Sequence, residues 1–294
     1  MKKLKILYKN HIKTQSPPGS NWIPVFLFLF FTLNSALLTP SYAEPPNRII
    51  SLAPSITEIL FAAGLGDRIA GVTTFCDYPE EAKEKPKIGG MSNPSLEAVV
   101  SLKPDIVVMT TDGNPKEFEQ RLHSMKIRTY VFRSRRLSDL PDGIRKMGIA
   151  LDAKPGFDAL ALEIEKALAE FKTKKILDGK KIVFIIWPEP LIVAGPGTAI
   201  DDAITLLGAE NIARDTKMQY PKYSMEEIVR RSPDVIFIGT ASGMDMRKTS
   251  RGLLKRISYI PAVKNNKVFY VSDSLYRLGP RVIKGIEELE GYLR

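Results

Sequence analysis

One stretch of this sequence occurs twice, and the repeat limits the possible folds more than any other feature. Residues 95–108 read SLEAVVSLKPDIVV and residues 224–237 read SMEEIVRRSPDVIF, so a Ser, a Glu, a Pro and an Asp recur at an offset of 129 residues. A looser similarity relates residues 64–69 to residues 208–212. Because repeated sequence units fold into repeated structural units, the chain is predicted to contain two similar lobes.

A long helix is predicted between the two lobes. Apolar residues follow helical spacing from Phe157 to Phe171, and no Gly or Pro interrupts the pattern before Asp178. We expect a helix of about 33 Å that links the lobes as a rigid rod, although one more helix covering a sheet is the alternative. The predicted segments are a leader at 1–43, an N-terminal lobe at 44–154, the linking helix at 155–177 and a C-terminal lobe at 178–294.

Short apolar runs in both lobes predict β-strands. The runs lie at residues 48–53, 69–73, 105–109, 128–132, 181–186, 235–238 and 267–271. They are apolar on both faces, which is typical of parallel strands covered by helices on both sides. Helical stretches separate them, so the predicted fold class is α/β, with a mainly parallel sheet in each lobe.

The first 43 residues resemble an export signal. They contain five lysines and no acidic residue, then an apolar run at 23–31, and they end in Ser41-Tyr42-Ala43. This pattern predicts a secretory signal peptide that is cleaved after Ala43. An uncleaved membrane anchor is the alternative, although a spanning helix takes about 20 apolar residues. No cysteine lies near the cleavage point, so we expect a soluble protein beyond the inner membrane and not a lipoprotein.

Composition excludes several classes of function. About half of the formal net charge of +10 comes from the leader lysines, and no basic stripe follows, so no nucleic-acid partner is expected. The single cysteine, Cys76, excludes an intramolecular disulfide and is predicted to pack as a small apolar residue. The only histidine after the leader, His123, is expected on a helix face. No nucleophile elbow, Walker loop or zinc motif occurs, so we expect no catalytic residue and no metal site.

The repeat places one acid on each lobe. Ser95 and Ser224 are predicted N-caps, and Glu97 and Glu226 then fall in the first turn of their helices, where Glu227 would complete a capping box with Ser224. Either acid alone is explained by the helix dipole. An acid at the same place on both lobes also predicts two points for docking onto a partner with basic pockets.

Aromatic and polar residues follow several predicted strands. Ligands of open α/β sheets bind beyond the carboxyl ends of the strands, so we expect these residues to line a cleft between the lobes. Several rings would suit a broad, flat and partly apolar ligand. The residues include Phe75, Tyr78, Thr110, Trp187, Tyr220 and the segment 273–277.

Three motifs resemble a known family. RIISLAPSITEIL at 48–60, GVTTFCDYP at 71–79 and SLEAVVSLKPD at 95–105 look like the helical-backbone (class III) periplasmic binding proteins that serve import of iron complexes, heme and cobalamin. The Cys-Asp-Tyr-Pro loop looks most like the cobalamin branch. The resemblance implies a periplasmic protein that delivers its ligand to an inner-membrane ABC permease with its ATPase subunits. It also implies that Glu97 and Glu226 dock to arginines of the permease.

The resemblance also implies a ligand site. The predicted ligand-binding residues are Phe75, Tyr78, Met91, Thr110, Trp187, Tyr220, Asp273, Ser274, Leu275, Tyr276 and Arg277. Met91, Thr110 and Ser274 stand where the cobalamin branch carries tryptophan, and Trp187 and Tyr276 are expected to compensate. Arg281 would favour an anionic ligand.

The expected function is therefore capture of cobalamin or a related corrinoid by a monomer that uses no cofactor. Heme or a ferric siderophore is the alternative ligand. A chelatase-like enzyme is the least favoured reading, because it would need an acid–base or metal cluster in the cleft.

Overall fold

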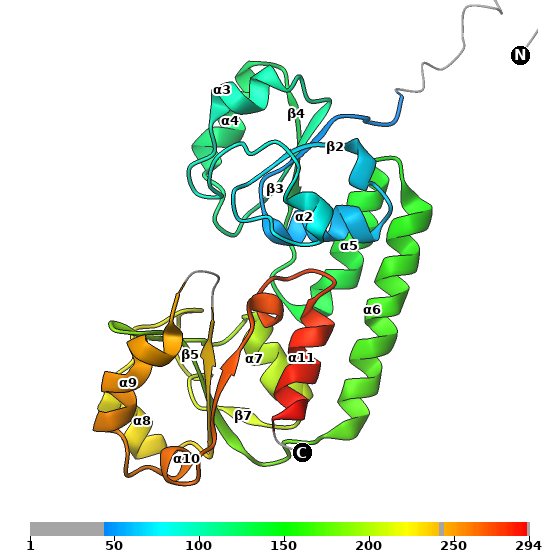
Figure 1. Ribbon diagram of the computed structural model, residues 1–294. Coiled ribbons are helices and arrows are strands. Elements are labelled where there is room, and N and C mark those ends of the chain that lie inside the picture. The colour runs from blue at the N-terminus through cyan, green and yellow to red at the C-terminus, as the bar shows by residue number, and fades with distance from the viewer. Residues whose placement is uncertain (1–43, 241–243, 293–294) are drawn as a thin grey trace, which may run out of the picture. The chain divides into compact units, whose positions relative to one another are not determined.

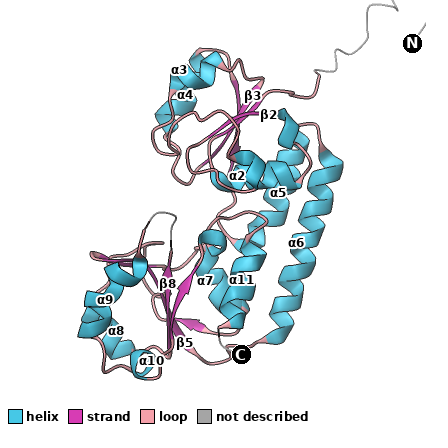
Figure 2. Cartoon of the chain, viewed as in Figure 1, coloured by secondary structure: helices cyan, strands magenta, loops and turns pink. Residues whose placement is uncertain are grey.

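The strands form two separate sheets in the part of the chain that the computed structural model describes, residues 44–240 and 244–292 (Figures 1 and 2). The predicted signal peptide, residues 1–43, lies outside the described residues. Among the helices of the described part, none is both long enough and apolar enough to cross a membrane.

The first sheet has the strand order β2-β1-β3-β4 and all of its pairs are parallel. Its strands are β1 (Ile49–Ser51), β2 (Ile69–Val72), β3 (Ile106–Thr110) and β4 (Arg128–Phe132). The helices of this half are α2 (Pro54–Ala62), α3 (Leu96–Ser101), α4 (Lys116–Ser124) and α5 (Leu140–Ala150), with 3-10 turns η2 (Gly66–Arg68), η3 (Glu80–Ala82) and η4 (Leu137–Asp139). Strand β3 is buried along its whole length, which explains its unbroken apolar sequence.

The second sheet has the order β6-β5-β8-β9, and β7 pairs with β5. Its strands are β5 (Lys181–Pro188), β6 (Leu191–Val193), β7 (Glu210–Asn211), β8 (Val235–Gly239) and β9 (Val268–Val271). The helices are α7 (Ala199–Leu206), α8 (Met225–Arg231), α9 (Met246–Arg256), α10 (Pro261–Lys264) and α11 (Val282–Gly291), with the 3-10 turn η5 (Asp273–Leu275). The antiparallel edge strand β6 was not predicted, because it returns directly from β5 and contains three residues. The predicted fold class, two mainly parallel sheets covered by helices, is confirmed.

The long helix α6 covers Lys154–Lys174, slightly less than the predicted 155–177. It ends where Lys175 adopts a left-handed conformation with φ of 40°. Helix α6 packs along α5 and also contacts α7 and α11, so it is a packed helix and not an isolated rod (Figure 1).

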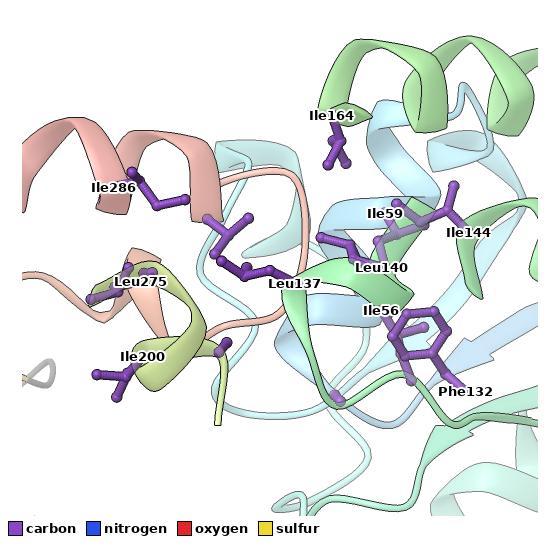
Figure 3. Packing of buried hydrophobic residues seen from close by; sticks show 14 of the residues in the cluster. Ile56, Ile59, Phe132, Leu137, Leu140, Ile144, Ile164, Ile200, Leu275 and Ile286 are labelled. Carbon is purple, nitrogen blue, oxygen red and sulfur yellow. The ribbon is translucent and has the colours of Figure 1, made fainter. Parts of the chain in front are cut away.

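One apolar core extends over both halves of the chain, that is, over the first half before α6, which contains the first sheet, and the second half after α6, which contains the second sheet. The cluster includes Ile56 and Ile144 from the first half, Ile164 from α6, and Ile200 and Ile286 from the second half (Figure 3). Two smaller clusters cover the other face of each sheet. Because the core is shared, residues 45–294 form one unit, and the lobe boundaries at 154 and 178 stay a prediction.

The contact between α5 and α6 depends on the absence of a side chain at Gly148. A Cβ at this position would lie 2.6 Å from Cβ of Phe157, which is fully buried. We expect Gly148→Ala to lower the free energy of unfolding by about 1–2 kcal/mol, because the helices must move apart. Urea denaturation measures this change. The control is Gly252→Ala in α9, where a Cβ would have nothing within 4 Å and should stabilise the protein by about 0.5–1 kcal/mol. A Gly148→Ala protein as stable as the wild type would contradict the close helix contact.

Candidate functional site

A cavity of about 240 Å³ lies where the two halves of the chain face each other. Its walls in the first half follow the carboxyl ends of β1, β3 and β4, the place where open α/β sheets bind ligands. Residues at the start of α7, before α8 and after β9 supply the opposite wall. The lining residues are Ala53, Pro54, Ser55, Met91, Thr110, Asp112, Phe132, Ser134, Arg135, Ala199, Ile200, Tyr220, Tyr276, Arg277 and Leu278.

Five of the predicted ligand-binding residues line this cavity. They are Met91, Thr110, Tyr220, Tyr276 and Arg277. The Tyr276 hydroxyl donates a hydrogen bond to the carbonyl oxygen of Thr240, which fixes the ring against the second sheet. Partial burial, and then the charge of Asp112, raise the pKa of Tyr220 to about 12. Burial, and then the charge of Asp273, also raise the pKa of Tyr276, so both tyrosines stay neutral over the physiological pH range.

Two further predicted residues, Phe75 and Tyr78, lie on an exposed loop of the first half. The side chain of Phe75 is 60% exposed, and its ring lies 3.6 Å from where a Cβ would stand on Gly90, next to the lining residue Met91. Tyr78 is 40% exposed, and its ring lies 4.6 Å from the guanidinium carbon of Arg281. These rings offer apolar surface outside the lining of the cavity.

Three more of the predicted residues, Leu275, Ser274 and Trp187, are not among those that line the cavity. Leu275 is fully buried in the shared core and packs against Gly285 of α11, and its contact with a ligand stays a prediction. Ser274 is also buried, and its hydroxyl accepts a hydrogen bond from Arg281. Trp187 packs beside the cluster on the outer face of the second sheet and donates its indole N–H to the carbonyl oxygen of Glu189.

One wall of the cavity was not predicted from the sequence. Ser134 and Arg135 follow β4 directly, and Ser55 follows β1. The rule that ligands bind at the carboxyl ends of strands applies to the predicted strand 128–132 as well as to its neighbours, so residues 133–135 could have been found.

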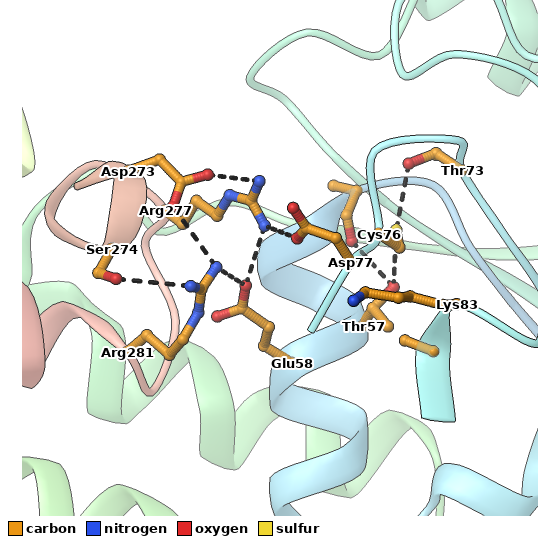
Figure 4. Close-up of polar contacts among 12 residues, drawn as sticks. Thr57, Glu58, Thr73, Cys76, Asp77, Lys83, Asp273, Ser274, Arg277 and Arg281 are labelled. Atoms are coloured by element: carbon orange, nitrogen blue, oxygen red, sulfur yellow. Dashed lines mark hydrogen bonds and ion pairs between the residues drawn. The ribbon is translucent and has the colours of Figure 1, made fainter. Parts of the chain in front are cut away.

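Charged residues from both halves form a buried network beside the cavity (Figure 4). Arg277 contacts Asp77 at 2.6 Å, Asp273 at 2.5 Å and Glu58 at 3.4 Å. Arg281 contacts Glu58 at 2.7 Å and Asp273 at 3.7 Å. The Glu58 side chain on α2 is only 1% exposed. Two residues of the predicted ligand site, Asp273 and Arg277, are therefore bound to other protein groups.

The network shifts the protonation of its members. Burial raises the pKa of Glu58, and the hydrogen bonds and charges of Arg281 and Arg277 act in the opposite direction. Burial alone would lower the pKa of Arg277, but the hydrogen bond that it donates to Asp77 and the charge of Asp273 outweigh burial and raise that pKa. Arg277 thus remains a cation whose charge is balanced within the protein. Arg281, expected to favour an anionic ligand, is balanced in the same way by Glu58.

The two repeat helices begin as predicted. The Ser95 hydroxyl accepts from the Ala98 amide at 3.2 Å, and the Ser224 hydroxyl accepts from the Glu227 amide at 3.1 Å. The predicted capping box is incomplete, because the Glu227 carboxylate pairs with Arg230 and Arg231.

Both predicted docking acids have exposed side chains. Glu97 lies in the first turn of α3 and Glu226 in the first turn of α8. Hydrogen bonds from its own amide and from Ser224 lower the pKa of Glu226, so this carboxylate is charged at neutral pH.

The other reactive side chains are used structurally. Cys76 is 2% exposed, burial raises the pKa of its thiol, and the thiol lies 3.1 Å from the hydroxyls of Thr57 and Thr73. His123 lies on α4, as expected, and contacts the Thr129 hydroxyl at 2.7 Å. Within the described residues, no group of three or more His, Cys, Asp or Glu could hold a metal ion.

Arg281 is expected to hold the two halves together through Glu58. We predict that Arg281→Met lowers the free energy of unfolding by about 2–3 kcal/mol, because it leaves the buried Glu58 carboxylate with only its longer contact to Arg277. Lys284→Met is the control, since Lys284 also lies over the Tyr78 ring but is exposed; its effect should stay within about 0.5 kcal/mol. Equal effects of the two variants in urea denaturation would contradict this role of Arg281.

Comparison with known proteins agrees with the fold. A family model described as periplasmic binding protein matches residues 49–275. The vitamin B12-binding protein of Pectobacterium atrosepticum is 29% identical over 270 residues, which cover 90% of this chain and 94% of that protein.

Two solved structures share the fold. The periplasmic vitamin B12-binding protein of Vibrio cholerae has a TM-score of 0.74 and 26% identity, covering 85% of this chain and 97% of that one. The apo form of a periplasmic heme-binding protein from Roseiflexus has a TM-score of 0.76 and 27% identity, covering 84% of this chain and 97% of that one.

These similarities confirm a substrate-binding protein and not an enzyme. The family implies a periplasmic location, a small-molecule ligand and an ABC permease with its ATPase as partner. Since the family model matches most of its length, this chain belongs to the periplasmic binding protein family.

Proposed function

We propose that this protein captures cobalamin or a related corrinoid in the periplasm and delivers it to an ABC permease. The observation that carries the proposal is the cavity at the strand ends, lined from opposite halves by Met91 and by Tyr220 and Tyr276. It occurs in a chain that is similar over 90% of its length to a vitamin B12-binding protein.

The size of the cavity suggests how such a ligand would bind. Sites that enclose a drug-sized ligand measure about 300–1,000 Å³, and this cavity measures about 240 Å³. A corrin ring would therefore rest at the mouth, with part of the ligand inside. Phe75 and Tyr220 are both more than 40% exposed and would contact the ring faces there.

Heme is the second candidate ligand. The favourable observation is the similarity to the heme-binding protein of Roseiflexus. Arg281 does not favour heme, because Glu58 balances the charge of that cation.

Titration of the purified protein with cyanocobalamin, hemin and a ferric hydroxamate distinguishes the ligands. We expect corrinoid binding at micromolar or lower Kd and no comparable binding of the other two. Phe75→Ala and Tyr220→Ala should each weaken cyanocobalamin binding by about tenfold, because each removes one ring contact. Tyr259→Ala is the control, since Tyr259 is 56% exposed and does not line the cavity. Tight binding of hemin alone would exclude the corrinoid proposal.

Glu97 and Glu226 are proposed as the docking points for the permease. The support is their exposure, their position in the first turn of corresponding repeat helices, and their origin from different halves of the chain. Two separated carboxylates would orient the protein on basic pockets of the partner.

Charge reversal tests the docking proposal. We expect Glu97→Arg/Glu226→Arg to bind ligand normally but to lower ligand uptake by at least about tenfold in vesicles that contain the permease and its ATPase, because like charges then face each other. The control variant Glu117→Arg/Glu287→Arg reverses two other exposed acids, one in each half. Docking through these acids is excluded if the first variant supports uptake at the wild-type rate.

Two further features complete the proposal. The protein would be exported by a signal peptide that is cleaved after Ala43, and it would act as a monomer.

A further inference from the structure

Three charged residues line the cavity: Arg277, Arg135 and Asp112. Arg277 is balanced by Asp77, Asp273 and Glu58. Arg135 has an exposed side chain, and its Nε lies 3.4 Å from the Thr111 hydroxyl, a long hydrogen bond to a neutral group. Within residues 44–240 and 244–292, no carboxylate lies within ion-pair distance of Arg135. The cavity therefore has one cation whose charge is available to a ligand.

The neighbours of Arg135 hold it in this position. Arg136 pairs with Asp202 of α7, with Nη2 and Oδ1 2.5 Å apart, and the Leu137 amide donates to the same carboxylate at 2.9 Å. Leu137 is buried in the shared core. The segment after β4 is thus attached to the opposite half of the chain immediately beyond Arg135. Ser134, on the other side, also lines the cavity and donates its hydroxyl proton to the Asp139 carbonyl at 3.0 Å.

The three arginines of this segment have different surroundings. Arg136 pairs with Asp202, and Arg135 lines the cavity. Arg133 lies on the surface outside the cavity. Arg133 and Arg135 are both exposed cations two residues apart, so they form a matched pair for experiment.

We infer that Arg135 binds an anionic group of the ligand and so determines which ligand is preferred. On the proposed function, on which this inference rests, that group is the phosphodiester of the nucleotide loop of a complete corrinoid. A guanidinium suits it because two parallel N–H groups can donate to two phosphate oxygens. Asp112, the remaining charged residue of the lining, accepts hydrogen bonds only and suits the amide N–H groups that corrinoids carry.

Dicyanocobinamide is the informative probe, because it has the corrin ring and its amides but lacks the nucleotide loop and its phosphate. We expect Arg135→Gln to weaken cyanocobalamin binding about five- to tenfold, as for a charge-assisted hydrogen bond at a partly exposed site. Binding of dicyanocobinamide should change less than about twofold. Arg133→Gln should leave both affinities unchanged. Added salt should weaken wild-type binding of cyanocobalamin but have little effect on Arg135→Gln.

Several outcomes would overturn the inference. It fails if Arg135→Gln leaves cyanocobalamin affinity unchanged, or if it weakens both corrinoids equally. A matching loss in Arg133→Gln would also overturn it, because the effect would then be one of general surface charge.

A failure of the proposed function looks different, because wild-type protein would then bind neither corrinoid. If wild type binds hemin instead, the phosphodiester assignment is overturned. The propionates of hemin carry negative charge, so Arg135 keeps its role as an anion-binding residue if Arg135→Gln weakens the binding of hemin. That role is overturned if the affinity for hemin is unchanged.

Discussion

The shared apolar core is the constraint on which the rest of this structure depends. Helix α6 packs along α5 and contacts α7 and α11, and apolar side chains from both halves belong to one cluster. Burial of apolar surface stabilises the folded state by about 25 cal/mol per Å², so separating the halves would require a large free energy. The walls of the cavity are consequently held at a defined separation. Any change between a free and a loaded state is expected to be small compared with closure about a loop hinge.

Charges next to the cavity add directional contacts to this core. Glu58, Arg277, Arg281, Asp77 and Asp273 come from segments more than 190 residues apart and meet where the halves face each other. Buried ion pairs add less net stability than their Coulomb energy suggests, because desolvation opposes them, but each group needs its partner once it is buried. The network therefore determines how the two halves are aligned. It also neutralises Arg277, which leaves Arg135 as the cation of the lining that is available to a ligand.

Much of the fold could be predicted from local patterns. The strands predicted at 128–132 and 235–238 follow from short apolar runs, and the long helix follows from apolar periodicity. The N-caps Ser95 and Ser224 follow from short side-chain chemistry at a helix start. Strand β6 was missed because three residues are too few to produce a periodic signal. The burial of Leu275 could not be predicted, because a motif match gives no information on which side of a 3-10 turn a residue faces.

The sequence by itself determined the α/β fold class, the long helix and the family, because all of these are encoded in residue order and spacing. Only the tertiary structure decided which charges are balanced. Whether Arg277 is free for a ligand depends on two carboxylates that are distant in the chain, Glu58 and Asp77, because Coulomb interactions depend on distance in space. Chemical function at this site is therefore a property of the folded arrangement and not of any one motif.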